Sequence, residues 1–124
     1  MTYRVVSLAA SVVCLLLCLI LLLLPDVIYW LFNITGAEVS DFLARRAAML
    51  FLGFAVLCFL GRNAEDSEMR RTVSVAMAIA MAGLAATGIF EFMRGYVGIG
   101  IWLAIVVEVA FAVLFGRFWV LGRR

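Results

Sequence analysis

Long apolar runs separated by short polar segments dominate this chain. A helix needs about 20 mostly apolar residues to cross a bilayer, and four runs have about that length. They span residues 5–24, 42–61, 72–92 and 97–115. The pattern predicts a single all-α domain over residues 1–124, built from four transmembrane helices.

Short polar connections join the last three runs, so neighbouring helices should be antiparallel. Residues 62–71 are polar and carry charges of both signs, and Gly95-Tyr96 predicts a very tight last turn. The first run stops at Pro25-Asp26, and no small-residue cleavage site follows it. We therefore expect an uncleaved first span rather than a signal peptide, and an antiparallel four-helix bundle overall.

The first connection differs from the others because much of it is apolar. Residues 27–32 have the sequence VIYWLF, and aromatic residues such as Tyr29 and Trp30 are typical of the lipid headgroup region. This segment is predicted to be a short interfacial or re-entrant element. Ser40 or Asp41 should then cap the second spanning helix, where a side-chain oxygen satisfies free backbone N–H groups.

Composition agrees with a lipid environment. The chain is 68% hydrophobic, whereas a soluble domain is closer to half apolar. A net charge of +2 gives no indication of nucleic-acid binding. All ten basic residues are arginine, and the bias toward arginine and alanine indicates a GC-rich bacterial genome. We therefore expect a multi-pass protein of a bacterial inner membrane.

The arginines are distributed unevenly between the two sides of such a bundle. With four spans, both termini and the second loop share one side. That side carries Arg4, Arg62, Arg70, Arg71, Arg117, Arg123 and Arg124. The other side carries Arg45, Arg46 and Arg94. Because arginine-rich segments stay in the cytoplasm, both termini are predicted to be cytoplasmic.

The residue types that usually carry chemistry are scarce. The chain has no histidine, which removes the commonest metal ligand and general base. Its cysteines, Cys14, Cys18 and Cys58, lie inside apolar runs and form no CxxC pair. Buried thiols of this kind behave as small apolar packing residues. We therefore predict no enzyme activity, no cofactor and no metal site.

Small residues recur at helical spacing and predict where the helices pack, since small side chains let helix backbones approach closely in lipid. The third run carries Ser74, Ala78, Ala82 and Ala86 at four-residue spacing. The other two stripes are Ala44, Ala48, Ala55 and Cys58 in the second run, and Ser7, Ser11, Cys14 and Cys18 in the first. Packing within the chain is the favoured interpretation, and self-association into a homo-oligomer is the alternative.

Glu108 interrupts an apolar run that otherwise extends from Val97 to Phe115. A carboxylate in the bilayer core is costly and needs a reason. The second run has only 15 charge-free residues, 47–61, or about 22 Å of helix, which draws Arg45 and Arg46 toward the membrane interior.

Helix register places these arginines within reach of Glu108 in one direction and of Glu91 in the other. Gly53 shares a face with Arg46 and would let another helix approach. These residues form a candidate intramembrane charge pair, with snorkelling of the arginines toward water as the alternative.

Three interpretations of Glu108 remain open. It pairs with Arg45 or Arg46 and sets the bundle's register, it stays protonated and hydrogen-bonds locally, or it serves proton- or cation-coupled transport. The predicted function is a non-enzymatic accessory or assembly subunit of a larger membrane complex. The alternative is a small transporter or a lipid- or quinone-binding protein that uses Glu108 with the two arginines.

A few short motifs carry a family resemblance. They are Pro25, then Leu31-Phe32, then Ala44-Arg45-Arg46 leading into residues 50–53. In this layout the chain resembles small bacterial four-helix inner-membrane proteins of unknown function, which have an arginine opening the second span and a glycine later within it. The resemblance implies the four-span architecture and a role for Arg45 or Arg46. It implies no activity.

Overall fold

The computed structural model describes residues 1–65 and 67–121, and within these ranges the chain forms five helices and no strand. They are α1 (Tyr3–Leu23), α2 (Pro25–Phe32), α3 (Glu38–Gly61), α4 (Glu68–Met93) and α5 (Ile101–Leu121). All but α2 are long and apolar enough to cross a membrane. The predicted four-helix architecture is confirmed and is consistent with an integral membrane protein, while the orientation of the termini stays a prediction.

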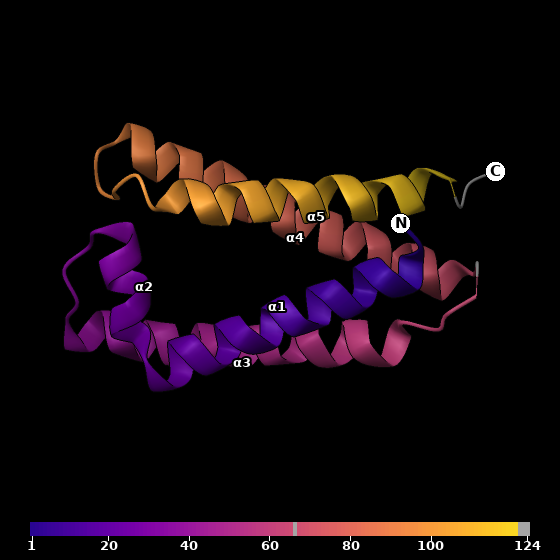
Figure 1. Cartoon of the computed structure of the whole chain (residues 1–124), viewed down its shortest axis with the longest axis horizontal. Coiled ribbons are helices and arrows are strands. Elements are labelled where there is room, and N and C mark those ends of the chain that lie inside the picture. The colour runs from indigo at the N-terminus through magenta and orange to yellow at the C-terminus, as the bar shows by residue number, and fades with distance from the viewer. Residues whose placement is uncertain (66, 122–124) are drawn as a thin grey trace.

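The four long helices form two antiparallel pairs, α1 with α3 and α4 with α5 (Figure 1). The pairs approach each other near the N-terminus and diverge toward α2 (Figure 1). We call the end that holds Tyr3, Gly61, Glu68 and Leu121 the closed end, and the end that holds α2 the open end. The bundle is therefore shaped by where its two pairs meet and where they separate.

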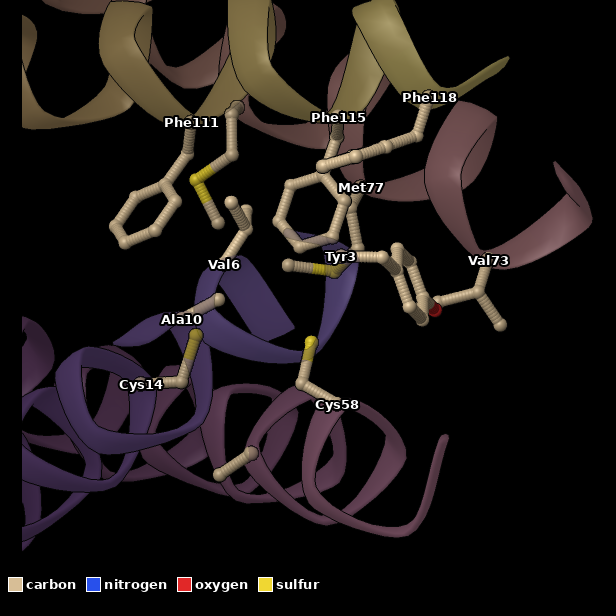
Figure 2. Packing of buried hydrophobic residues seen from close by; sticks show 12 residues of the cluster. Tyr3, Val6, Ala10, Cys14, Cys58, Val73, Met77, Phe111, Phe115 and Phe118 are labelled. Atoms are coloured by element: carbon tan, nitrogen blue, oxygen red, sulfur yellow. The ribbon is translucent and has the colours of Figure 1, made fainter. Parts of the chain in front are cut away.

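A cluster of buried side chains joins the two pairs at the closed end (Figure 2). Val6 of α1, Met77 of α4 and Phe115 of α5 have no exposed surface at all. Tyr3 packs edge-on against the ring of Phe118, with ring centroids 5.5 Å apart. In lipid, such close packing is the main attraction between helices, because lipid tails are as apolar as the side chains themselves.

Within the α1–α3 pair, the two predicted small-residue stripes are confirmed as the contact faces. The buried residues of α3 are Ala44, Ala48, Ala55 and Cys58. Those of α1 include Ser7, Ser11, Cys14 and Cys18. The Ser11 hydroxyl donates a hydrogen bond of 2.8 Å to the Ala55 carbonyl oxygen, so a polar contact also links the two helices.

The predicted stripe on α4 is only half right. Ser74 is buried and Ala78 is partly buried, but Ala82 and Ala86 are exposed. The buried face of α4 instead runs through Val73, Ser74, Met77, Met81 and Ala85. With 3.6 residues per turn, each four-residue step overshoots a full turn by about 40°, so a strict four-residue stripe winds off the buried face.

Gly53 is likewise exposed, and a side chain added there would meet nothing within 4 Å. Within residues 1–65 and 67–121, no helix approaches α3 closely at Gly53. The predicted close approach at Gly53 is therefore not made within the chain.

The short apolar and aromatic element predicted in the first connection is a helix, α2, in the structure. Ser40 and Asp41 do not occupy the predicted N-cap position, because α3 begins at Glu38 with Ala37 before it, but the Ser40 oxygen does satisfy a backbone N–H at this helix end. The Ser40 hydroxyl reaches back one turn, accepting from the Ala37 N–H at 2.7 Å and donating to the Ala37 carbonyl at 2.8 Å. Acidic residues in a first helical turn are favoured by the helix dipole, and Glu38 and Asp41 occupy that turn.

The connection between α4 and α5 is longer than the predicted tight turn at Gly95-Tyr96, because α5 begins only at Ile101. This connection docks on α2 through backbone atoms. The Gly98 N–H donates to the Phe32 carbonyl oxygen at 2.6 Å. A Cβ atom at Gly100 would lie 1.9 Å from the Leu31 carbonyl oxygen. Gly98 and Gly100 therefore allow this connection to approach α2 closely.

We predict that Gly100→Ala destabilises the protein by about 1–3 kcal/mol, the usual cost of an overpacked site, because the obstructing atom is backbone and cannot rotate away. Gly53→Ala is the matched control and should be neutral or stabilising, since alanine is the better helix former. The free energy of unfolding in mixed micelles measures both. An equal cost at the two positions would contradict the docking of this connection on α2.

Candidate functional site

An apolar cleft of about 420 Å³ lies where the two helix pairs diverge. Each of the five helices contributes to its wall, and representative lining residues are Leu17 of α1, Ile28 of α2, Phe51 of α3, Leu84 of α4 and Leu103 of α5. A volume of this size falls in the range of ligand pockets. The cleft is therefore a product of the tertiary arrangement and of no single element.

The two ends of the cleft are formed differently. Cys14, Met81 and Phe111 line it and also belong to the buried cluster of the closed end, which makes that cluster the floor. At the open end, Leu31 and Phe32 of α2 line it, and the α4–α5 connection is hydrogen-bonded to the Phe32 carbonyl oxygen. The cleft is thus bounded along the bundle axis by packed side chains at one end and by α2 at the other.

Glu108 is the one charged side chain among the described residues that line this cleft. It lies on α5, one turn from Phe111 toward the open end, and is partly buried. It makes no hydrogen bond or ion pair with any described residue. A carboxyl group placed this way can exchange a hydrogen bond with a polar group that enters the cleft, because a protonated carboxyl both donates and accepts.

The structure does not bring Glu108 together with the arginines predicted as its partners. Arg45 and Arg46 are exposed on α3, and the Arg46 guanidinium lies 5.7 Å from the centroid of the Phe42 ring. The physical reason is that α3 and α5 belong to different helix pairs, which diverge at this end. Helix register fixes only the depth of a residue along the bundle axis, and the lateral distance between α3 and α5 keeps these side chains apart.

Glu91, the other carboxylate of the candidate pair, forms an ion pair with Arg94 at the C-terminal end of α4. Its Oε1 atom lies 3.3 Å from Nη1 of Arg94. Sequence reasoning missed this partner, although residues three apart on a helix are neighbours and the spacing would have indicated it. Glu91 is therefore not a partner of Arg45 in this structure.

Tyr29 is a further polar side chain that sequence reasoning placed only in the headgroup region. It is buried on α2, and a Cβ atom at Gly36 would lie 2.7 Å from its ring. Burial raises the pKa of the Tyr29 phenol, and the nearby Asp41 carboxylate raises it further. The ring packs α2 onto the segment that leads into α3, which holds the wall of the cleft in place.

Among the described residues, no three His, Cys, Asp or Glu side chains lie close enough together to hold a metal ion. Cys14, Cys18 and Cys58 are buried and free. The functional candidate that the geometry presents is therefore the cleft with its single carboxyl group.

Comparison with known proteins gives no match: no protein family, curated protein or solved structure is similar to this chain at a significant level. The resemblance to small inner-membrane proteins accordingly still rests on its few short motifs.

We predict that Glu108→Gln and Arg46→Gln affect stability independently, because the two side chains share no contact in the structure. The free energies of unfolding of both single variants should add to that of the double variant within about 0.5 kcal/mol. A second double-mutant cycle combines Glu108→Gln with Arg45→Gln in place of Arg46→Gln. A coupling well above that value in either cycle would show that the charges pair in the membrane.

Proposed function

We propose that this chain is a non-enzymatic membrane protein that binds a lipid- or quinone-like molecule in the cleft between its helix pairs. The observation that supports this most directly is the position of Glu108, an unpaired carboxyl group on an otherwise apolar wall. Chemistry of this kind fits an amphiphile with a long apolar part and a polar group at one end.

The apolar wall supports the binding of a molecule with a long apolar part. An empty cleft loses the contacts that its lining atoms would otherwise make, and the surrounding bilayer supplies hydrocarbon chains that restore them. Leu17, Leu84 and Leu103 face the cleft from three different helices, so a chain lying in it would be contacted from several sides.

The Glu108 carboxyl group supports the presence of a polar group at one end of the bound molecule. An ionisable side chain in the middle of a membrane helix costs about 2.5–3.5 kcal/mol on insertion scales, and no described residue offsets that cost at Glu108. A hydroxyl or carbonyl group on the bound molecule would do so through a hydrogen bond. We favour binding over ion transport because a transport path needs further polar groups, and Glu108 stands alone in this wall.

The accessory-subunit role stays a prediction. Large apolar side chains are exposed on all four long helices, and such a surface suits lipid and a partner helix equally. One experiment addresses both functions. The protein is extracted in a mild detergent, and everything that remains bound is identified by mass spectrometry. A lipophilic molecule at one per chain supports the cleft proposal, whereas a stoichiometric protein partner without one supports the subunit.

We predict that Glu108→Leu lowers the amount of co-purified lipophilic molecule severalfold while leaving the thermal stability unchanged or raised, since it removes an unpaired polar group from an apolar wall. Glu108→Gln, which still hydrogen-bonds, should retain more of the ligand. Glu91→Gln is the control, because Glu91 lies outside the cleft. Full retention in Glu108→Leu would contradict a role for the carboxyl group in binding.

A further inference from the structure

A second cavity, of about 460 Å³, lies at the closed end of the bundle, away from α2 and from the Glu108 cleft. Its charged lining residues are all arginines: Arg4 from α1, Arg62 just after α3 and Arg70 from α4. Thr2 and Asn63 add polar groups to the same wall. The start of α1 and the region around the α3–α4 connection, which are distant in sequence, therefore bring positive charge to one opening.

Two of these arginines are held in place by aromatic rings. The Arg62 guanidinium lies 4.0 Å from the centroid of the Phe59 ring, and its Nη1 atom donates to the Phe59 carbonyl oxygen. The Arg70 guanidinium lies 4.6 Å from the Tyr3 ring centroid. Stacking on a ring leaves the edge of a guanidinium free to donate hydrogen bonds, so the charges are positioned before a ligand arrives.

No carboxylate neutralises these arginines within the described residues, where the one ion pair joins Arg94 to Glu91 at the other end of the bundle. Glu65 lies in the α3–α4 connection and Glu68 is the first residue of α4, but neither lines the cavity. The N-terminus of α1 adds to the positive potential, because its first backbone N–H groups have no partner within the helix. The cavity therefore favours an anion.

We propose that this cavity binds the phosphate group of an anionic phospholipid. The planar guanidinium group matches phosphate oxygens in a two-bond geometry, and basic pockets between the ends of membrane helices suit such headgroups. The closed end is also an end of the membrane spans, so the cavity lies near headgroup depth. The exposed apolar surface of Phe59 beside Arg62 offers a contact for the lipid's glycerol and acyl portion.

The test reconstitutes the full chain in nanodiscs with equal amounts of phosphatidylglycerol and phosphatidylcholine, and counts retained lipids by native mass spectrometry. The wild type should retain phosphatidylglycerol preferentially. Arg4→Gln/Arg62→Gln should reduce that preference about 30-fold, given the usual contribution of about 1 kcal/mol from each basic residue at an anionic surface. Arg117→Gln, an exposed arginine of α5 at the same end that does not line the cavity, should change it by at most the about fivefold expected from one basic residue near the surface.

Three results would overturn the proposal. They are an unchanged preference in the double variant, an equal loss in Arg117→Gln, and complete displacement of the lipid by millimolar inorganic phosphate, which would assign the cavity to free phosphate. Circular dichroism confirms that each variant is folded. If the double variant does not fold, Arg4→Gln alone decides the question, because the Arg4 side chain is exposed and has no ring contact; an unchanged preference there also overturns the proposal.

Discussion

The tight junction of the two helix pairs at one end governs the rest of this structure. Val6, Met77 and Phe115 lose all exposed surface there, and each comes from a different helix. Because attraction between helices in lipid depends on close packing, large side chains that fit one another hold the pairs together only over the part of their length where they meet. The helix pairs diverge beyond this cluster, and the cleft toward α2 follows from their divergence.

The divergence gives the bundle two sites of opposite character. Beyond Phe111 the pairs separate, and the space between them is apolar except for Glu108. At the closed end the helix termini gather, and the arginines that flank the spans surround one opening. The membrane amphiphile proposed for the first site and the phosphate headgroup proposed for the second would both be drawn from the bilayer itself.

The backbone contact between α2 and the α4–α5 connection sets how far the pairs can separate. The Gly98 N–H and the Phe32 carbonyl oxygen are 2.6 Å apart, and Gly100 leaves no room for a side chain beside Leu31. Two segments from opposite pairs are thereby tied at the end where the long helices are apart. The cleft is consequently framed on both ends, which allows it to keep a shape suited to one kind of molecule.

The sequence by itself determined the helices and their local faces, because the length of an apolar run and the spacing of small residues act within one helix. It indicated four spans, a short apolar element at residues 27–32 and the buried stripes of α1 and α3. Only the tertiary structure decided the partner of each side chain. Whether Glu108 meets Arg46 depends on how far α5 lies from α3, and that separation is set by packed side chains such as Val6 and Met77, which are remote in sequence from both groups.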